Sequence, residues 1–244
     1  MTDLLLALLI ALTSPRELFS RANAAYEAGD YVRSIALYDS ASQSLVSADI
    51  LFNRGNAYFK QGRIGRAIAD YLRAHVLRPT DRDIRHNLAF CRQFRPDRSL
   101  EVENPLIRLL TDGLRLFSPG LLRIIAAVAF LFALASIALL LVSGRHYFGY
   151  LAIGLGVLFL YSLLGILSWN GLTDPNRAVV IVPEVVLRAG PGPEYKELAI
   201  VHDGLEVSIR ERRPGFVLIQ IPGGEGGWAE ESAIEQVFPK NLAF

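Results

Sequence analysis

The chain of 244 residues has a single cysteine, Cys91, which excludes a disulfide bond within the chain. Charged side chains are also scarce, at 20% of residues against 52% hydrophobic ones. This is an apolar composition for a soluble protein. The formal net charge is only +1, so nothing in the overall charge indicates a nucleic-acid partner.

No group of residues indicates catalysis or metal binding. The sequence has no zinc-ligand spacing, no phosphate-binding loop and no serine elbow. Cys91 follows His86 within one predicted helix, at a spacing that does not bring the two side chains onto one face, and a cysteine there is typical of a small core residue. We therefore predict that the protein is not an enzyme and has no catalytic residue, metal site or cofactor.

The hydrophobic excess lies mainly in two runs, residues 124–142 and 148–167. Neither run contains Asp, Glu, Lys or Arg, and each is about long enough to cross a bilayer as a helix. Residues 143–147 join them and include Gly144, which favours a tight loop. The sequence therefore predicts a hairpin of two transmembrane helices.

Two further segments bear on the membrane prediction. Residues 104–118 are apolar on one face, which predicts a helix lying at the membrane surface. Residues 1–14 contain a short apolar run that is typical of a secretory signal, with a first solenoid helix as the alternative. A signal would place both terminal parts outside the cytoplasm. The arginines that flank the predicted spans favour the opposite orientation, and we favour the orientation set by the signal.

Residues 48–81 have the spacing of a tetratricopeptide repeat, in which two antiparallel helices pack through small residues. Gly55 and Ala67 are small and allow the two helices to approach each other closely. Gly62 suits the end of the first helix, where positive φ is favoured, and Pro79 ends the second helix. The positions that match the repeat are Leu51, Gly55, Tyr58, Ala67, Tyr71, Ala74 and Pro79.

A degenerate copy of the pattern precedes this repeat and occupies residues 15–47. Its Gly29 stands in the place that Gly62 has in residues 48–81. A third helix is predicted over 82–94 as a polar-faced cap. Two repeats and a cap make a short solenoid, because stacking normally needs about three units. We therefore expect part of its apolar face to be covered by another part of the chain or by a partner.

Residues 177–237 alternate short apolar runs with Gly- and Pro-rich turns, which predicts a small β-barrel. The ordered segments VLRAGP, DGLEV, FVLI and GGWA resemble the bacterial SH3 domain. The predicted fold class is therefore multidomain α + β. It combines an α-helical tetratricopeptide solenoid, a two-helix transmembrane hairpin and a small all-β SH3-like barrel.

Charge is divided unevenly along the chain. Residues 15–98 carry fourteen Lys and Arg against nine Asp and Glu, whereas residues 172–244 carry seven against eleven. Electrostatic attraction between the two parts would explain this difference. Chance on two solvated surfaces is the explanation that we favour from the sequence.

The order of the parts resembles the BatE-like proteins of the Bat (aerotolerance) family over nearly the whole chain. The resemblance rests on the signal-like start, the segments ANAAYEAGDY, GNAYFKQG and HNLAF, the hairpin and the SH3-like part. It implies a non-enzymatic component of an envelope or stress complex, anchored in a bacterial inner membrane with its other domains in the periplasm. It also implies two kinds of partner, von Willebrand A-domain membrane proteins and a MoxR-type ATPase system.

In tetratricopeptide proteins the first helix of each repeat lines a concave groove that binds a partner protein. Asn23 and Asn56 suit hydrogen bonds to a ligand backbone, and Lys60 suits a carboxylate. The alternative for the two phenylalanines of this set is that they only pack against neighbouring helices. The predicted groove residues are Phe19, Asn23, Tyr26, Phe52, Asn56, Phe59 and Lys60.

A second hypothesis assigns binding to the SH3-like barrel, with cell-wall peptidoglycan as the ligand and the repeats as a spacer. Its candidate surface residues are Tyr195, Phe216 and Trp228. For Trp228 the alternative is a place in the barrel core, which we favour from the sequence.

Overall fold

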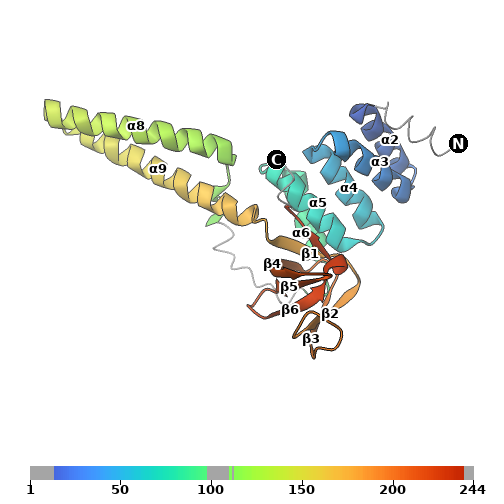
Figure 1. The fold of residues 1–244 in the computed structure, drawn as a ribbon. Helices are drawn as coiled ribbons and strands as arrows, with labels where there is room; N and C mark the ends of the chain where they lie inside the picture. The colour runs from blue at the N-terminus through green and yellow to red at the C-terminus, as the bar shows by residue number, and fades with distance from the viewer. Residues whose placement is uncertain (1–13, 98–109, 112, 239–244) are drawn as a thin grey trace. The chain divides into compact units, whose positions relative to one another are not determined.

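The computed structural model describes residues 14–97, 110, 111 and 113–238. The chain divides into two compact units, one made of residues 1–102 and 175–244 and the other of residues 103–174. Figure 1 shows the helices and strands of each unit. The first unit holds the predicted repeats and the predicted β domain, so these two parts pack directly on each other.

Five helices form the solenoid: the first four make two antiparallel hairpins, and the fifth follows them as the cap (Figure 1). The turn inside each hairpin uses a glycine at positive φ, Gly29 at 77° and Gly62 at 74°, as the spacing predicts for Gly62. The cap helix, predicted over 82–94, ends two residues earlier than predicted, at Arg92. The helices are α2 (Pro15–Glu27), α3 (Tyr31–Ser44), α4 (Ala48–Lys60), α5 (Ile64–Leu77) and α6 (Arg82–Arg92).

Most of these helices begin at a side chain that caps the free amide groups of the first turn. Ser14, Asp30, Ser47 and Asp81 each accept a backbone N–H in this way. Helix α5 has no such local cap. Its first turn is capped instead from the β domain, where Asp203 Oδ1 accepts the Gly65 N–H at 3.0 Å.

The β domain is one antiparallel sheet with the strand order β3-β2-β6-β5-β4-β1-β7. Its inward-facing residues, such as Leu187, Val217 and Ile219, form one apolar core. The predicted all-β domain is confirmed, while its likeness to the SH3 domain stays a prediction. The strands are β1 (Arg177–Val180), β2 (Glu184–Arg188), β3 (Glu197–His202), β4 (Glu206–Arg213), β5 (Phe216–Gln220), β6 (Gly226–Glu230) and β7 (Ile234–Gln236).

The outer face of α5 is covered by the β domain. Val179, Val237 and Phe238 are buried in the same apolar cluster as Ile68 and Leu72 of α5. The expectation that the short solenoid needs a cover is therefore confirmed, and the cover is the chain itself. Burying this face removes apolar surface from water, which is the main favourable contribution to folding.

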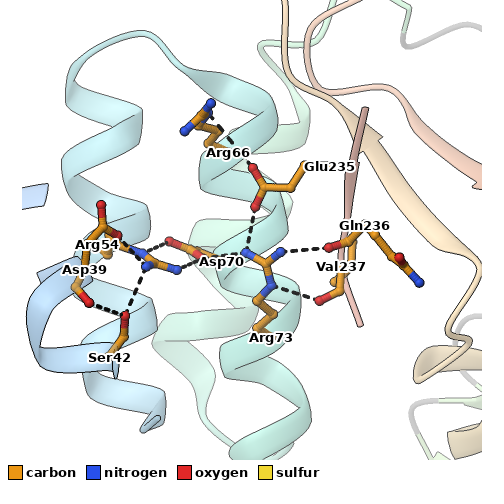
Figure 2. Close-up of polar contacts among 9 residues, drawn as sticks. All are labelled: Asp39, Ser42, Arg54, Arg66, Asp70, Arg73, Glu235, Gln236 and Val237. Carbon is orange, nitrogen blue, oxygen red and sulfur yellow. Dashed lines mark hydrogen bonds and ion pairs between the residues drawn. The ribbon is translucent and has the colours of Figure 1, made fainter. Parts of the chain in front are cut away.

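A buried ionic network runs through the same interface. Asp70, which is 1% exposed, takes a bidentate contact from Arg54 with both distances at 2.7 Å and a third contact from Arg73 at 3.0 Å. Arg73 also donates to the Val237 and Gln236 carbonyls, each at 2.9 Å. Figure 2 shows these contacts. Burial alone would lower the pKa of Arg54, but the paired carboxylates of Asp70 and Asp39 raise it above the ordinary value.

A second cluster of opposite charges lies at the junction of α6 and the sheet. Glu206 receives two contacts from Arg92, at 2.7 and 3.1 Å, and one from Arg177 at 2.5 Å. Arg73 similarly meets Glu235 of β7 at 2.9 Å. These contacts support electrostatic attraction as an explanation of the uneven charge. Basic residues of the solenoid pair with acidic residues of the β domain across a low-dielectric contact.

The second unit contains two long apolar helices, α8 (Pro119–Ser143) and α9 (Tyr147–Leu172). They are longer than the predicted runs 124–142 and 148–167, and Gly144 ends α8 at φ 65°. The segment before α8 is held against α9, since Tyr161 donates to the Gly113 carbonyl at 2.8 Å. The predicted signal-like segment lies almost wholly outside the described residues. Of the predicted surface helix over 104–118, residues 104–109 and 112 lie outside them, residues 110, 111, 113 and 114 are helical, and residues 115–118 are not, so the helix ends before the predicted bound.

The charges around Glu206 generate a prediction about pH. Burial alone would raise the pKa of Glu206, but the charges of Arg92 and Arg177 outweigh it and hold the pKa below the ordinary value of 4.5. Because the folded-state pKa is lowered, the stabilisation is fully present above pH 4.5 and is lost as the pH falls below it. We expect Glu206→Gln to cost about 3 kcal/mol at pH 7 and to flatten this acid dependence.

The measurement is chemical unfolding of the full chain in detergent, followed by Trp228 fluorescence in a Trp169→Phe background. Glu225→Gln is the control, since Glu225 is exposed in the turn between β5 and β6. Equal pH dependence in the two variants would contradict the assigned role of Glu206.

Candidate functional site

We call α2, α4 and α6 the inner helices and α3 and α5 the outer helices of the solenoid. The inner helices line two adjacent hollows of about 210 and 220 Å³. Both hollows include Tyr26 and Asn56, so together they form one continuous groove. The first is lined by Tyr26, Asn56, Phe59, Lys60, Tyr71, Asn87 and Phe90. The second is lined by Asn23, Tyr26, Glu27, Tyr38, Asn53 and Asn56.

Each repeat holds one asparagine side chain in a fixed orientation. Asn23 Oδ1 accepts the Tyr38 hydroxyl at 2.5 Å and the Asn53 Nδ2 at 3.1 Å. The outer helix supplies the tyrosine and the next inner helix supplies the second amide. Burial raises the pKa of Tyr38 to about 12, so the hydroxyl stays protonated and can donate at neutral pH.

The same arrangement recurs one repeat later. Asn56 Oδ1 accepts the Tyr71 hydroxyl at 2.7 Å and the Asn87 Nδ2 at 2.9 Å. Burial raises the pKa of Tyr71 above its ordinary value, so this hydroxyl also remains a donor. The repetition shows that the pairing belongs to the repeat architecture and not to one chance contact.

These contacts decide which amide atoms face a ligand. A carboxamide has one acceptor oxygen and two N–H donors. In Asn23 and Asn56 the oxygen is engaged, and within the described part of the chain neither Nδ2 group has an acceptor. In Asn53 and Asn87 the Nδ2 group already donates, so the Oδ1 atom is the group left to accept a hydrogen bond from a ligand. The groove thus offers both donors and acceptors, as the C=O and N–H groups of a peptide backbone require.

The end of the groove next to α6 is aromatic. The Phe59 ring lies 5.7 Å from the Phe90 ring and 5.3 Å from the Phe94 ring, measured between centroids. Phe90 and Phe94 remain 43% and 53% exposed. An exposed cluster of large apolar side chains beside hydrogen-bonding groups is typical of a protein-binding surface.

Five of the seven predicted groove residues line the hollows: Asn23, Tyr26, Asn56, Phe59 and Lys60. Phe19 and Phe52 do not. Phe19 packs against the Tyr38 ring and Phe52 against the Tyr71 ring, each at 5.9 Å between centroids. These ring contacts favour the alternative of helix packing for the two phenylalanines, and their part in binding stays a prediction.

Sequence reasoning missed part of the lining set. Asn53, Asn87 and Phe90 lie on inner helices and would have been found by extending the helical period from Asn56 along the solenoid. In the sequence Tyr71 is only a position that matches the repeat, and nothing there shows that its hydroxyl, or that of Tyr38, reaches the groove amides. That contact depends on how the outer helix packs on the inner one.

The three predicted surface residues of the β domain are all at least partly exposed. Trp228 alternates along β6 with the buried Gly227 and Ala229 and stands opposite Leu218 of β5. Trp228 is partly exposed and is not among the buried residues of the β-domain core, where we expected it from the sequence. Phe216 is also partly exposed, and Tyr195 is 43% exposed.

Among the described residues, no three His, Cys, Asp or Glu side chains are placed to hold a metal ion. Cys91 is fully buried and donates weakly to the Ile64 carbonyl at 3.8 Å. Burial raises the pKa of its thiol to about 12, so it is protonated at neutral pH. This environment is that of a core residue.

Residues 48–81 match the family model of the tetratricopeptide repeat. The match covers α4 and α5, the helices that carry Asn56, Lys60 and Tyr71. No curated protein matches the chain. Tetratricopeptide repeats are a non-catalytic fold that binds proteins, so the match supports a protein-interaction role and fits a protein that is not an enzyme.

The close crossing of α4 and α5 yields a prediction about stability. A Cβ atom added at Gly55 would lie 2.8 Å from Cε1 of the Tyr71 ring, so a larger side chain must displace the ring that orients Asn56. We expect Gly55→Leu to destabilise the unit by about 1–3 kcal/mol, because overpacking forces side chains and backbone to shift. Chemical unfolding measures this change.

Ala24→Leu is the matched control, since Ala24 is exposed on α2. It adds the same side chain at an open helical position and should leave the free energy of unfolding nearly unchanged. Equal destabilisation by both substitutions would contradict the importance of the close crossing.

Proposed function

We propose that this chain is a membrane-anchored scaffold whose solenoid groove binds an extended segment of a partner protein. The observation that carries the proposal is the repeated tyrosine–asparagine–asparagine arrangement, which holds amide groups in place along a continuous hollow. The β domain already covers the outer face of α5, whereas the inner face is open among the described residues. Binding proteins on the inner face is the general use of this repeat.

The proposed anchor is the helical hairpin of α8 and α9. Their most apolar stretches have mean hydropathies of 2.9 and 2.2, and only 17% and 11% of those stretches are buried. Large apolar side chains such as Phe132, Leu141 and Ile153 are more than 60% exposed. A bilayer core would cover such side chains, and both helices are long enough to cross it.

The proposed setting is a Bat-type envelope or stress complex of a bacterial inner membrane. It rests on the resemblance of the chain's order of parts to the BatE-like proteins. The partners proposed on that ground are von Willebrand A-domain membrane proteins and a MoxR-type ATPase system. Periplasmic domains are proposed from the signal-like start. An export-dependent reporter fused after Phe244 would be active in this orientation and inactive in the opposite one.

A second candidate function is binding of cell-wall peptidoglycan by the β domain acting as an SH3-like module. The observation that favours it is the outward position of Trp228 and Phe216, because exposed aromatic rings provide a flat surface for sugar or peptide ligands. Sedimentation of the full chain in detergent with purified cell wall tests this function. Loss of sedimentation in Trp228→Ala, with Asn56→Ala unchanged, would favour it over groove binding.

Membrane anchoring leads to a direct prediction. After alkaline carbonate treatment of membranes, we expect the full-length protein to remain in the pellet, because two apolar helices insert among the lipid chains. Immunoblotting of the pellet and the supernatant measures this. A peripheral membrane protein treated in parallel should be released, and recovery of this chain in the supernatant would rule out the hairpin as an anchor.

The groove leads to a second prediction. Asn56→Ala combined with Lys60→Ala should weaken crosslinking to partner proteins in native membranes while leaving helicity unchanged. Each lost hydrogen bond to a partner group that stays buried costs about 1–3 kcal/mol. Mass spectrometry of the crosslinked partners, compared between wild type and variant, measures the loss.

The matched control is Arg33→Ala combined with Gln43→Ala, since both residues are exposed on the outer helix α3. The control should crosslink the same partners as the wild type. If the groove variant also recovers them in equal amount, the partners bind elsewhere, and the outward side of the β domain becomes the leading surface.

A further inference from the structure

The two hollows of the groove carry opposite charges at equivalent places. Glu27 is the last residue of α2 and lines one hollow, while Lys60 is the last residue of α4 and lines the other. Both side chains are exposed, and neither forms an ion pair within the described part of the chain. The groove is therefore acidic beside the first repeat and basic beside the second.

The aromatic rings gather at the Lys60 side. Phe59 and Phe90 line the same hollow as Lys60, and Phe94 packs against both rings. The hollow next to Glu27 has a more polar lining of asparagine amides and two tyrosines, Tyr26 and Tyr38, and its lining includes no phenylalanine. A large apolar ligand side chain would be desolvated best in the aromatic hollow.

The distance between the two charged sites sets the spacing of the ligand charges. Packed neighbouring helices lie about 8–10 Å apart. An extended peptide advances by about 3.3–3.6 Å per residue. A segment that lies across α2 and α4 therefore passes from Glu27 to Lys60 in about three residues.

We propose that the groove selects a partner segment with three features: a Lys or Arg facing Glu27, a large apolar residue in the aromatic hollow, and an Asp or Glu facing Lys60. The basic and acidic residues stand about three positions apart. This proposal rests on the proposed function, because it names the kind of peptide that the same groove binds. The two charges fix the direction of the bound segment, since a segment bound in the reverse direction would place its acidic residue at Glu27 and its basic residue at Lys60.

The amides and the charges play separate roles. The Asn23 and Asn56 N–H groups bind the backbone of any extended segment, so they give affinity without sequence preference. Exposed charges add little affinity, but they discriminate between ligands and orient them. The charge preference should therefore weaken as salt screens the two sites, while binding through the amides and rings persists.

The test is selection of peptides from a displayed random ten-residue library on the full chain in detergent micelles. Wild-type protein should enrich peptides with an apolar residue next to an acidic residue and a basic residue about three positions from the acid. The variant Glu27→Lys with Lys60→Glu should enrich peptides with these charges exchanged. The wild-type-selected peptide, measured by fluorescence anisotropy, should bind this variant about tenfold more weakly.

Two further variants separate the inference from the proposed function. Arg33→Glu with Glu225→Lys exchanges two exposed charges outside the groove and should keep the wild-type peptide preference. Asn56→Ala should weaken all selected peptides regardless of their charge. If wild type enriches apolar peptides with no charge pattern and the groove charge exchange has no effect, the inference is overturned while the proposed function stands. If wild type enriches no peptide, both are overturned.

Discussion

Arg73 is the residue on which the arrangement of the first unit depends. Its guanidinium group bonds to Asp70 on its own helix and to Glu235, Gln236 and Val237 of the β domain. A buried charge is tolerated only when it is paired and hydrogen-bonded. The solenoid and the β domain therefore satisfy each other's buried polar groups, and neither could present this face to water without rearranging those contacts.

This arrangement assigns different tasks to the two faces of the solenoid. The outer face, centred on α5, is used for packing, and Asp203 caps the first turn of that helix from the β domain. The inner face keeps the amides and aromatic rings open among the described residues. A solenoid of two repeats has little apolar surface to bury between its own helices, so the β domain supplies the burial that further repeats would otherwise give. We infer that the rigidity of the groove depends on this support.

The groove itself is defined by hydrogen bonds between side chains of neighbouring helices. Tyr71 reaches through from α5 to hold Asn56, and Asn87 of α6 holds it from the other side. Because these bonds fix each amide before a ligand arrives, less conformational entropy is lost on binding. The same principle explains why Gly55 matters for function as well as for packing, since a side chain there would move the Tyr71 ring.

The sequence by itself determined the elements that follow from local chemistry. Gly29 and Gly62 set the turns, Pro79 lies just beyond the end of α5, the charge-free runs form α8 and α9, and Gly-rich turns separate the strands. These features depend on backbone preferences and on periodicity, which a sequence displays directly. Only the tertiary structure decided which charges meet across the interface, which phenylalanines line the groove and which amide atoms face it. Those outcomes depend on contacts between residues such as Arg73 and Glu235, which lie far apart in the chain, and local patterns carry no information about such pairings.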